Sequence, residues 1–85
     1  MPNIVMYTSS YCPYCTRAKA LLDRKGVTYE ERTVGLDPEG RQMLVDLTGR
    51  WTVPQVLVDD RPLGGWDDIH ALDREGRLDA ILGLA

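Results

Sequence analysis

The sequence predicts an α/β fold in which helices flank a four-stranded mixed sheet, with the elements in the order strand, helix, strand, helix, strand, strand, helix. Short runs of apolar and β-branched residues, typical of strands, alternate with longer segments of helix formers, and glycine or proline separates them. The first three elements fit within residues 4–34, the length that a parallel strand-helix-strand unit requires. We expect its crossover to be right-handed.

The first half of the chain supplies this unit. Residues 4–7 (Ile-Val-Met-Tyr) are uniformly apolar, which predicts a strand buried on both faces. Residues 13–25 are rich in helix formers and carry their apolar side chains on one face, and Gly26 follows as a C-terminal cap. Residues 27–34 contain β-branched and aromatic side chains and predict the second strand.

A second helix is predicted from its start and stop signals. Asp37 is a favourable N-cap, and Pro38 suits the first helical position because its missing N–H has no partner there anyway. Gly49 marks the end of this helix. Its apolar face is expected to consist of Met43, Leu44 and Leu47.

Two strands and a last helix complete the prediction. Residues 55–58 (Gln-Val-Leu-Val) indicate the third strand. Residues 62–64 indicate a fourth strand at the edge of the sheet, because Pro62 has no N–H to donate to a neighbour. The last helix follows a pair of glycines and is interrupted at Gly76.

Size and composition limit the functional classes. The 85 residues predict a single domain, residues 1–85, and the formal net charge of −3 disfavours a nucleic-acid binder, which would need clustered Lys and Arg. The longest apolar run, residues 4–7, is far shorter than the ~20 residues that cross a bilayer, and no secretory h-region follows Met1. We expect a cytoplasmic protein with no membrane or nucleic-acid partner.

The two cysteines, Cys12 and Cys15, are the candidate catalytic residues. Cys12 falls where the first strand has ended and the first helix begins, so that backbone N–H groups and the positive end of the helix dipole stabilise a thiolate. Cys15 lies one turn further into the helix, close enough to attack a mixed disulfide on Cys12 and less accessible to outside thiols. Pro13 stiffens the turn between the two sulfurs. The pair predicts thiol–disulfide exchange.

Two structural explanations of the cysteines are weaker. A permanent disulfide would close so short a loop that it would add about 2 kcal/mol of stability at most on the entropy model. A zinc site would need four ligands, and two thiolates with the lone His70 fall short, so no metal site is expected. His70 is expected to be a helix-surface or packing residue.

Three segments together resemble the bacterial glutaredoxins of the dithiol type: Cys12-Pro13-Tyr14-Cys15, residues 52–55 (Thr-Val-Pro-Gln) and residues 64–68 (Gly-Gly-Trp-Asp-Asp). The resemblance covers nearly the whole chain. It implies a thioredoxin-like fold and an oxidoreductase that reduces glutathione mixed disulfides and protein disulfides. By this resemblance, Cys12 is the nucleophile and Cys15 the resolving thiol. Glutathione is then a co-substrate and not a tightly bound cofactor, glutathione reductase acts indirectly through glutathione, and the chain is a monomer.

The resemblance also implies a glutathione groove beside Cys12. The Val53 backbone pairs with the cysteinyl part of glutathione, next to Thr52 and a cis peptide bond at Pro54. The γ-glutamyl end is received by backbone N–H groups at Trp66 and Asp67 and by the Asp67 carboxylate, consistent with anion binding at a helix N-terminus. The remaining implied contacts are Tyr14, which flanks the groove, and Arg41, which reaches the glycyl carboxylate.

The sequence departs from the family pattern at three positions. Ser9 stands where many relatives carry a Lys near the nucleophile, so Arg41 or Arg50 would have to supply that charge. Trp51 and Trp66 are large aromatic residues near the groove, and they either cover local backbone or form a docking surface for a partner.

Two other functions stay open at this point. One is an iron–sulfur cluster carrier bridged by Cys12 and glutathione, which the stiff Pro13 disfavours. The other is a redoxin reduced by thioredoxin reductase, which the glutathione-type pattern of residues 64–68 disfavours.

Overall fold

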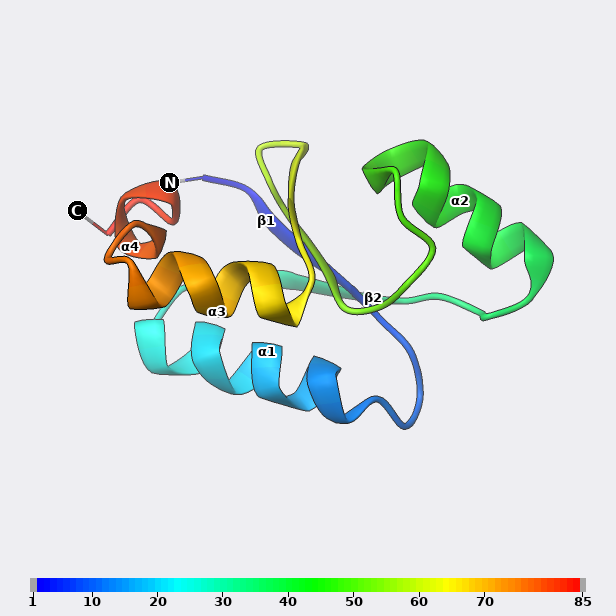
Figure 1. The fold of residues 1–85 in the computed structure, drawn as a ribbon, viewed down its shortest axis with the longest axis horizontal. Helices are drawn as coiled ribbons and strands as arrows, with labels where there is room; N and C mark the ends of the chain where they lie inside the picture. The colour runs from blue at the N-terminus through cyan, green and yellow to red at the C-terminus, as the bar shows by residue number, and fades with distance from the viewer. Residues whose placement is uncertain (1, 85) are drawn as a thin grey trace.

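The computed structural model describes residues 2–84, and its elements follow the predicted order with one short helix added at the end (Figure 1). They are β1 (Ile4–Thr8), α1 (Pro13–Lys25), β2 (Glu30–Thr33), α2 (Pro38–Thr48), β3 (Gln55–Val58), β4 (Arg61–Gly64), α3 (Trp66–Arg74) and α4 (Leu78–Ile81). The break between α3 and α4 includes Gly76, where the interruption was predicted.

The four strands form one mixed sheet in the order β2-β1-β3-β4. β1 runs parallel to β2 and antiparallel to β3, and β3 pairs with β4 as an antiparallel hairpin. The predicted α/β class, the parallel first unit and the edge position of the proline-bearing strand β4 are confirmed.

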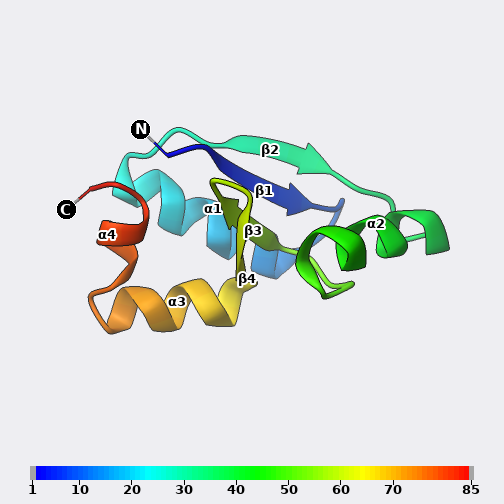
Figure 2. The ribbon, with the colours of Figure 1, turned by 90° about the horizontal axis from the view of Figure 1, so that it is seen from above.

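β1 lies at the centre of the core because both of its faces are covered. Ile4 and Met6 join a large apolar cluster with α1, α3 and α4, whereas Val5 and Tyr7 join a smaller cluster that includes one side chain of α2. All five residues of β1 are buried, as predicted for residues 4–7. α1 and α3 lie side by side (Figure 1), and Figure 2 shows α2 and α4 at opposite ends of the molecule.

The two helices that begin with proline have the predicted bounds and caps. α1 ends at Gly26 and α2 at Gly49, both with positive φ (73° and 81°), a conformation that glycine adopts without a steric penalty. The Asp37 side chain accepts a hydrogen bond from the backbone N–H of Gly40 (2.8 Å), as expected of an N-cap. Next to the Gly26 cap, the last residue of α1, Lys25, forms ion pairs with Asp73 (2.6 Å) and Asp79 (2.7 Å), which join α1 to α3 and α4.

Two predicted details are wrong. The second strand spans Glu30–Thr33, not residues 27–34, and its side chains are exposed, because it is an edge strand paired only with β1. On α2, Leu44 alone is buried, and Met43 and Leu47 are 39% and 42% exposed, because the small cluster that α2 covers takes one side chain from this helix. None of the helices in residues 2–84 combines the length and apolar character needed to cross a membrane.

Candidate functional site

Cys12 is the N-cap residue of α1, in the position that Ser, Asp or Asn commonly takes. Its backbone is extended (φ −123°, ψ 103°), and its sulfur accepts a hydrogen bond from the backbone N–H of Cys15 (Sγ···N 3.1 Å). The side chain is half-buried. The sulfur therefore lies at the N-terminal end of the helix dipole, at the place before the helix that the sequence predicted.

Cys15 occupies a different environment one turn further along α1. Its side chain is only 2% exposed, and both cysteines are free thiols. Burial, together with the hydrogen bond to Cys12, raises the pKa of the Cys15 thiol to about 12. The two sulfurs are thus unequal: one is half-buried and accepts a backbone N–H, and the other is buried and held as a thiol.

A loop between α2 and β3 approaches Cys12 from a distant part of the sequence. The Val53–Pro54 peptide bond is cis, as the resemblance implied. The Cys12 thiol donates to the carbonyl oxygen of Val53 across 3.8 Å, a contact that spans 41 positions in the chain. This loop brings backbone groups to the side of the Cys12 sulfur.

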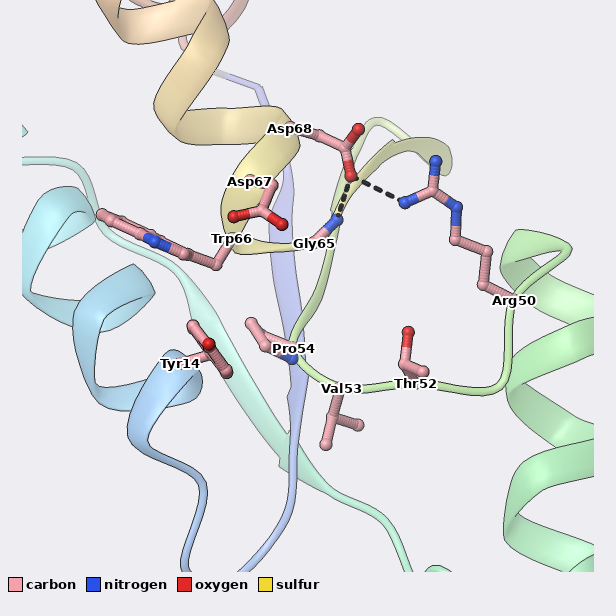
Figure 3. Close-up of a pocket in the computed structure, with 9 residues that line it drawn as sticks. All are labelled: Tyr14, Arg50, Thr52, Val53, Pro54, Gly65, Trp66, Asp67 and Asp68. Carbon is pink, nitrogen blue, oxygen red and sulfur yellow. Dashed lines mark hydrogen bonds and ion pairs between the residues drawn. The ribbon is translucent and has the colours of Figure 1, made fainter.

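A pocket of about 160 Å³ opens between this loop and the start of α3 (Figure 3). Its lining includes every predicted glutathione residue except Arg41, and three residues that the sequence analysis did not assign to the site. The lining residues are Tyr14, Arg50, Thr52, Val53, Pro54, Gly65, Trp66, Asp67 and Asp68.

The N-terminus of α3 forms one wall of this pocket. Asp68 accepts a hydrogen bond from the backbone N–H of Gly65 (2.9 Å), which fixes the first turn, and the Asp67 side chain stays exposed beside it. A Cβ atom on Gly65 would lie 3.0 Å from the carbonyl oxygen of Pro54, so glycine allows α3 to approach the cis-proline loop closely. The result is a set of unpaired helix N–H groups beside a carboxylate.

Arg50 closes the pocket at the end away from Trp66 and Tyr14, as Figure 3 shows. Its Nη1 atom lies 2.7 Å from Oδ2 of Asp68. Burial opposes ionisation of Asp68, but the hydrogen bonds from Arg50 and Gly65 outweigh burial and hold the pKa of this carboxyl below its ordinary value. The sequence analysis named Arg50 only as a possible replacement for the charge absent at Ser9, and its place immediately before residues 51–54 is the signal that could have assigned it to this pocket.

Arg41 takes a different position. Its guanidinium lies over the ring of Trp51 (5.1 Å to the centroid), and the residue is not part of the pocket lining. Its predicted contact with a glycyl carboxylate stays a prediction.

Aromatic side chains form the other end of the pocket. Trp66 stacks on His70 one turn along α3, with the ring centroids 4.8 Å apart and the planes at 14°. The expectation that His70 is a packing residue on the helix surface is therefore met. Tyr14 is 53% exposed and lies below the guanidinium of Arg17 (5.3 Å to the centroid).

A second cavity, of about 390 Å³, adjoins the cysteines and was not predicted from the sequence. It shares no lining residue with the first pocket. Its lining includes both cysteines and an ion pair between Lys19 of α1 and Glu31 of β2. Ser9, which stands where many relatives have Lys, also lines this cavity. Within residues 2–84, no cluster of three or more His, Cys, Asp or Glu side chains is placed to hold a metal ion.

Comparisons with known proteins find glutaredoxins by family model, by sequence and by structure. The family model described as glutaredoxin matches residues 4–63. The chain is 50% identical to a glutaredoxin from Pseudomonas aeruginosa, over 96% of this chain and 98% of the relative, and 45% identical to glutaredoxin 3 from Escherichia coli, over 96% and 99%.

Solved structures with similar folds include two informative glutaredoxins. The Brucella melitensis protein has a TM-score of 0.84 and 43% identity, covering 99% of this chain and 91% of its own. The buckwheat protein, solved as a glutaredoxin–glutathione complex, has a TM-score of 0.80 and 33% identity, covering 96% and 77%. These similarities confirm the thioredoxin-like fold that the sequence predicted.

Proposed function

The chain belongs to the glutaredoxin family and is a glutathione-dependent thiol–disulfide oxidoreductase, and from this premise we propose that Cys12 is its nucleophile and Cys15 its resolving thiol. The observation that carries the assignment is the inequality of the two sulfurs. Cys12 is accessible and accepts a backbone N–H, whereas Cys15 is buried with a pKa raised to about 12. The thiolate is the attacking species, so the first attack comes from Cys12.

The proposed reaction with a protein disulfide has two exchange steps. The Cys12 thiolate attacks one substrate sulfur, a mixed disulfide forms, and the other substrate sulfur leaves as a thiolate that takes up a proton. Cys15 then loses its proton and attacks the Cys12 sulfur. A Cys12–Cys15 disulfide forms and the second substrate thiol is released, so the substrate gains two electrons and the enzyme loses two.

Glutathione restores the dithiol form. One glutathione thiolate attacks the Cys12 sulfur and releases Cys15, and a second attacks the resulting mixed disulfide, which yields glutathione disulfide and the Cys12 thiolate. A substrate that is already a glutathione mixed disulfide needs only Cys12. Cys12 takes the glutathione, the substrate thiol leaves, and a free glutathione completes the cycle.

We place glutathione in the pocket beside the cis-proline loop. The solved complex of the buckwheat relative with glutathione supports this choice. The Val53 backbone would align the cysteinyl part, next to Thr52 and Pro54, while Tyr14 flanks the sulfur. The α3 N-terminus at Trp66 and Asp67 would receive the γ-glutamyl carboxylate, and the Asp67 side chain its ammonium group.

A guanidinium would bind the glycyl carboxylate at the other end of the pocket. Arg50 lines that end, whereas Arg41 would have to leave the Trp51 ring to reach it. We therefore assign this role first to Arg50, and Arg41 remains the alternative that the family pattern suggests.

The same proposal extends to the substrates, the electron supply, the oligomeric state and the location of the protein. Disulfide-containing proteins would be substrates, and glutathione reductase would act indirectly by regenerating glutathione. The size of the chain supports one domain over residues 1–85, which we propose to act as a monomer, and its net charge of −3 supports a protein with no nucleic-acid partner. We propose a cytoplasmic location, where thiols are kept reduced.

A coupled assay tests the electron donor. NADPH oxidation is followed with a disulfide-bonded protein as substrate, using either glutathione with glutathione reductase or thioredoxin reductase alone. We expect turnover only with glutathione. Turnover with thioredoxin reductase alone would contradict the proposal. A visible absorption band after anaerobic reconstitution with iron and sulfide would support a cluster carrier instead.

A further inference from the structure

Lys19 and Glu31 form an ion pair that the exchange steps described above do not use. The pair links α1 to the edge strand β2, and Thr8 at the end of β1 donates its hydroxyl to Oε2 of Glu31 (3.3 Å). All three residues line the 390 Å³ cavity that also contains Cys12 and Cys15. A charged pair therefore lies beside the dithiol, in a cavity separate from the glutathione pocket.

The placement of Lys19 on α1 directs its charge toward the buried sulfur. Lys19 follows Cys15 by four residues, so the two side chains occupy the same face of the helix one turn apart. Both line the same cavity, which is open to solvent and not filled by apolar side chains. The ammonium group is the cation on this face that neighbours Cys15.

The electrostatics agree with this geometry. Burial and Cys12 raise the pKa of the Cys15 thiol, whereas the Ser9 backbone and the Lys19 charge oppose them. The opposing effect of Lys19 is the smallest of these. Hydrogen bonding to Glu31 is the main reason that the pKa of Lys19 lies above its ordinary value, and the Asp23 carboxylate adds to it.

The resolving step is the point at which this charge matters. In the dithiol form, with its pKa raised to about 12, the Cys15 thiol is almost entirely protonated at pH 7. The rate of attack on a mixed disulfide depends on the thiolate fraction. A neighbouring cation that favours the Cys15 anion therefore raises that rate directly.

We propose that Lys19 is a positioning residue for the resolving step: its ammonium group stabilises the Cys15 thiolate during attack on Cys12, and Glu31 moderates this effect by holding part of the Lys19 charge. The inference rests on the proposed roles of the two cysteines. In this step the Cys15 proton passes to solvent, the Cys15–Cys12 S–S bond forms, and the bond from Cys12 to the substrate sulfur breaks. Lys19 keeps its proton throughout.

The test breaks the same ion pair from its two sides. Lys19→Met removes the cation, and we expect it to lower the rate of protein-disulfide reduction at pH 7 by about three- to tenfold, since one unit of thiol pKa is a tenfold change in thiolate. Glu31→Gln frees the cation, and we expect it to raise that rate by about two- to threefold, a smaller effect because the pair is partly exposed to solvent. In the double variant, the gain from Glu31→Gln should disappear.

Reference reactions separate charge from structure. In each variant the rate is divided by the rate with a glutathione mixed disulfide, which needs Cys12 alone, and thermal unfolding is recorded. Lys19→Arg keeps the charge and is expected to retain most of the rate even if Lys19→Met folds poorly. An ion pair that merely holds α1 against β2 would give losses of the same sign in Lys19→Met and Glu31→Gln, and that result would overturn the inference.

A third variant distinguishes this inference from the proposed function. If Cys15→Ser loses the protein-disulfide reaction while the two ion-pair variants change in the same direction, the role of Lys19 alone is wrong. If Cys15→Ser keeps the full protein-disulfide reaction, both the role of Lys19 and the proposed role of Cys15 are overturned.

Discussion

The two cavities beside the dithiol differ in the groups that line them. The pocket next to Val53 combines backbone groups of the cis-proline loop and the first turn of α3 with the charged side chains of Arg50, Asp67 and Asp68. The cavity next to Cys15 offers charged and hydroxyl side chains, with Lys19 and Glu31 at its edge. In the first region the Val53 carbonyl oxygen contacts the Cys12 sulfur, whereas the second region is lined by both cysteines.

On the proposed roles, the first region serves substrate recognition and the second serves the resolving step. Substitution of Arg50 or Asp67 in the first region is then expected to alter affinity and to leave the reactivity of Cys12 largely intact. Substitution of Lys19 or Glu31 in the second region is expected to change the charge near Cys15 and so the resolving step. The protein should therefore respond differently to substitutions on its two sides.

Substitution of the two sulfurs should give the largest effects. Cys12→Ser is expected to reduce turnover of every disulfide substrate to the uncatalysed background, because a hydroxyl cannot replace the thiolate nucleophile. Cys15→Ser should keep the reaction with a glutathione mixed disulfide. It should lower protein-disulfide reduction by roughly tenfold or more, because only free glutathione can then release the substrate from its mixed disulfide with Cys12. Initial rates with the two substrates measure both effects. A Cys15→Ser variant that is inactive on the glutathione substrate would show that the roles are assigned wrongly.

Asp67 provides the next largest expected change, confined to the recognition side. Asp67→Ala removes a carboxylate proposed to face the ammonium group of glutathione, and a charge-assisted hydrogen bond of ~1.5 kcal/mol corresponds to about a tenfold rise in KM. We expect kcat to change little. Asp46→Ala, an exposed carboxylate on α2 outside the pocket, is the matched control. Equal effects of the two substitutions on KM would count against the placement of glutathione.

Substitutions of the two candidate arginines also test the glutathione pocket. Arg50→Ala is expected to raise KM for glutathione mixed disulfides by about three- to tenfold, the range for a partly exposed charged contact. Arg41→Ala is expected to have a smaller effect, because its side chain lies on Trp51. A larger effect at Arg41 would show that this side chain leaves the ring when glutathione binds.

Burial of Cys15 should also be visible in stability, as the smallest effect. Its pKa is raised to about 12 in the folded protein, from about 8.5 in an unfolded chain. The folded state therefore holds the proton more tightly, so this contribution to the free energy of unfolding is present below pH ~8.5 and is lost as the pH rises toward 12. Denaturant unfolding from pH 7 to 10 should show a steeper decline for the wild type than for Cys15→Ser. Parallel curves would contradict the buried-thiol description.

Local signals in the sequence predicted most of the fold. Asp37-Pro38 and Gly49 bounded α2 correctly, and the uniform apolar run of β1 predicted burial on both faces. The second strand was predicted too long because Val27 and Val34 are buried beyond the ends of the ladder, so their apolar character did not report strand pairing. Exposure of Met43 and Leu47 depends on how few side chains the α2 face of the sheet can accommodate, which periodicity does not encode.

The site residues also fall into two groups: those that local motifs predict and those that depend on contacts between distant elements. Cys12 and Cys15 form one contiguous motif that the sequence indicated directly, and residues 52–54 were indicated through the resemblance to the family. Arg50 and the Lys19–Glu31 pair depend on contacts between elements far apart in the chain, such as the parallel pairing that sets β2 beside β1. Arg41 and Arg50 both carry the positive charge that binding of the glycyl carboxylate requires. Only the path of the loop after α2, which places Arg50 in the pocket lining, distinguishes them.

The inequality of the two sulfurs is the central claim, and limited alkylation tests it most directly. The reduced protein is treated at pH 7 with less than one equivalent of iodoacetamide, and fragmentation mass spectrometry locates the modification within residues 1–17. The account predicts that Cys12 carries nearly all of the label and that Cys15 stays unmodified until the protein is unfolded. Label on Cys15 in the native protein, at a level equal to or above that on Cys12, would contradict it.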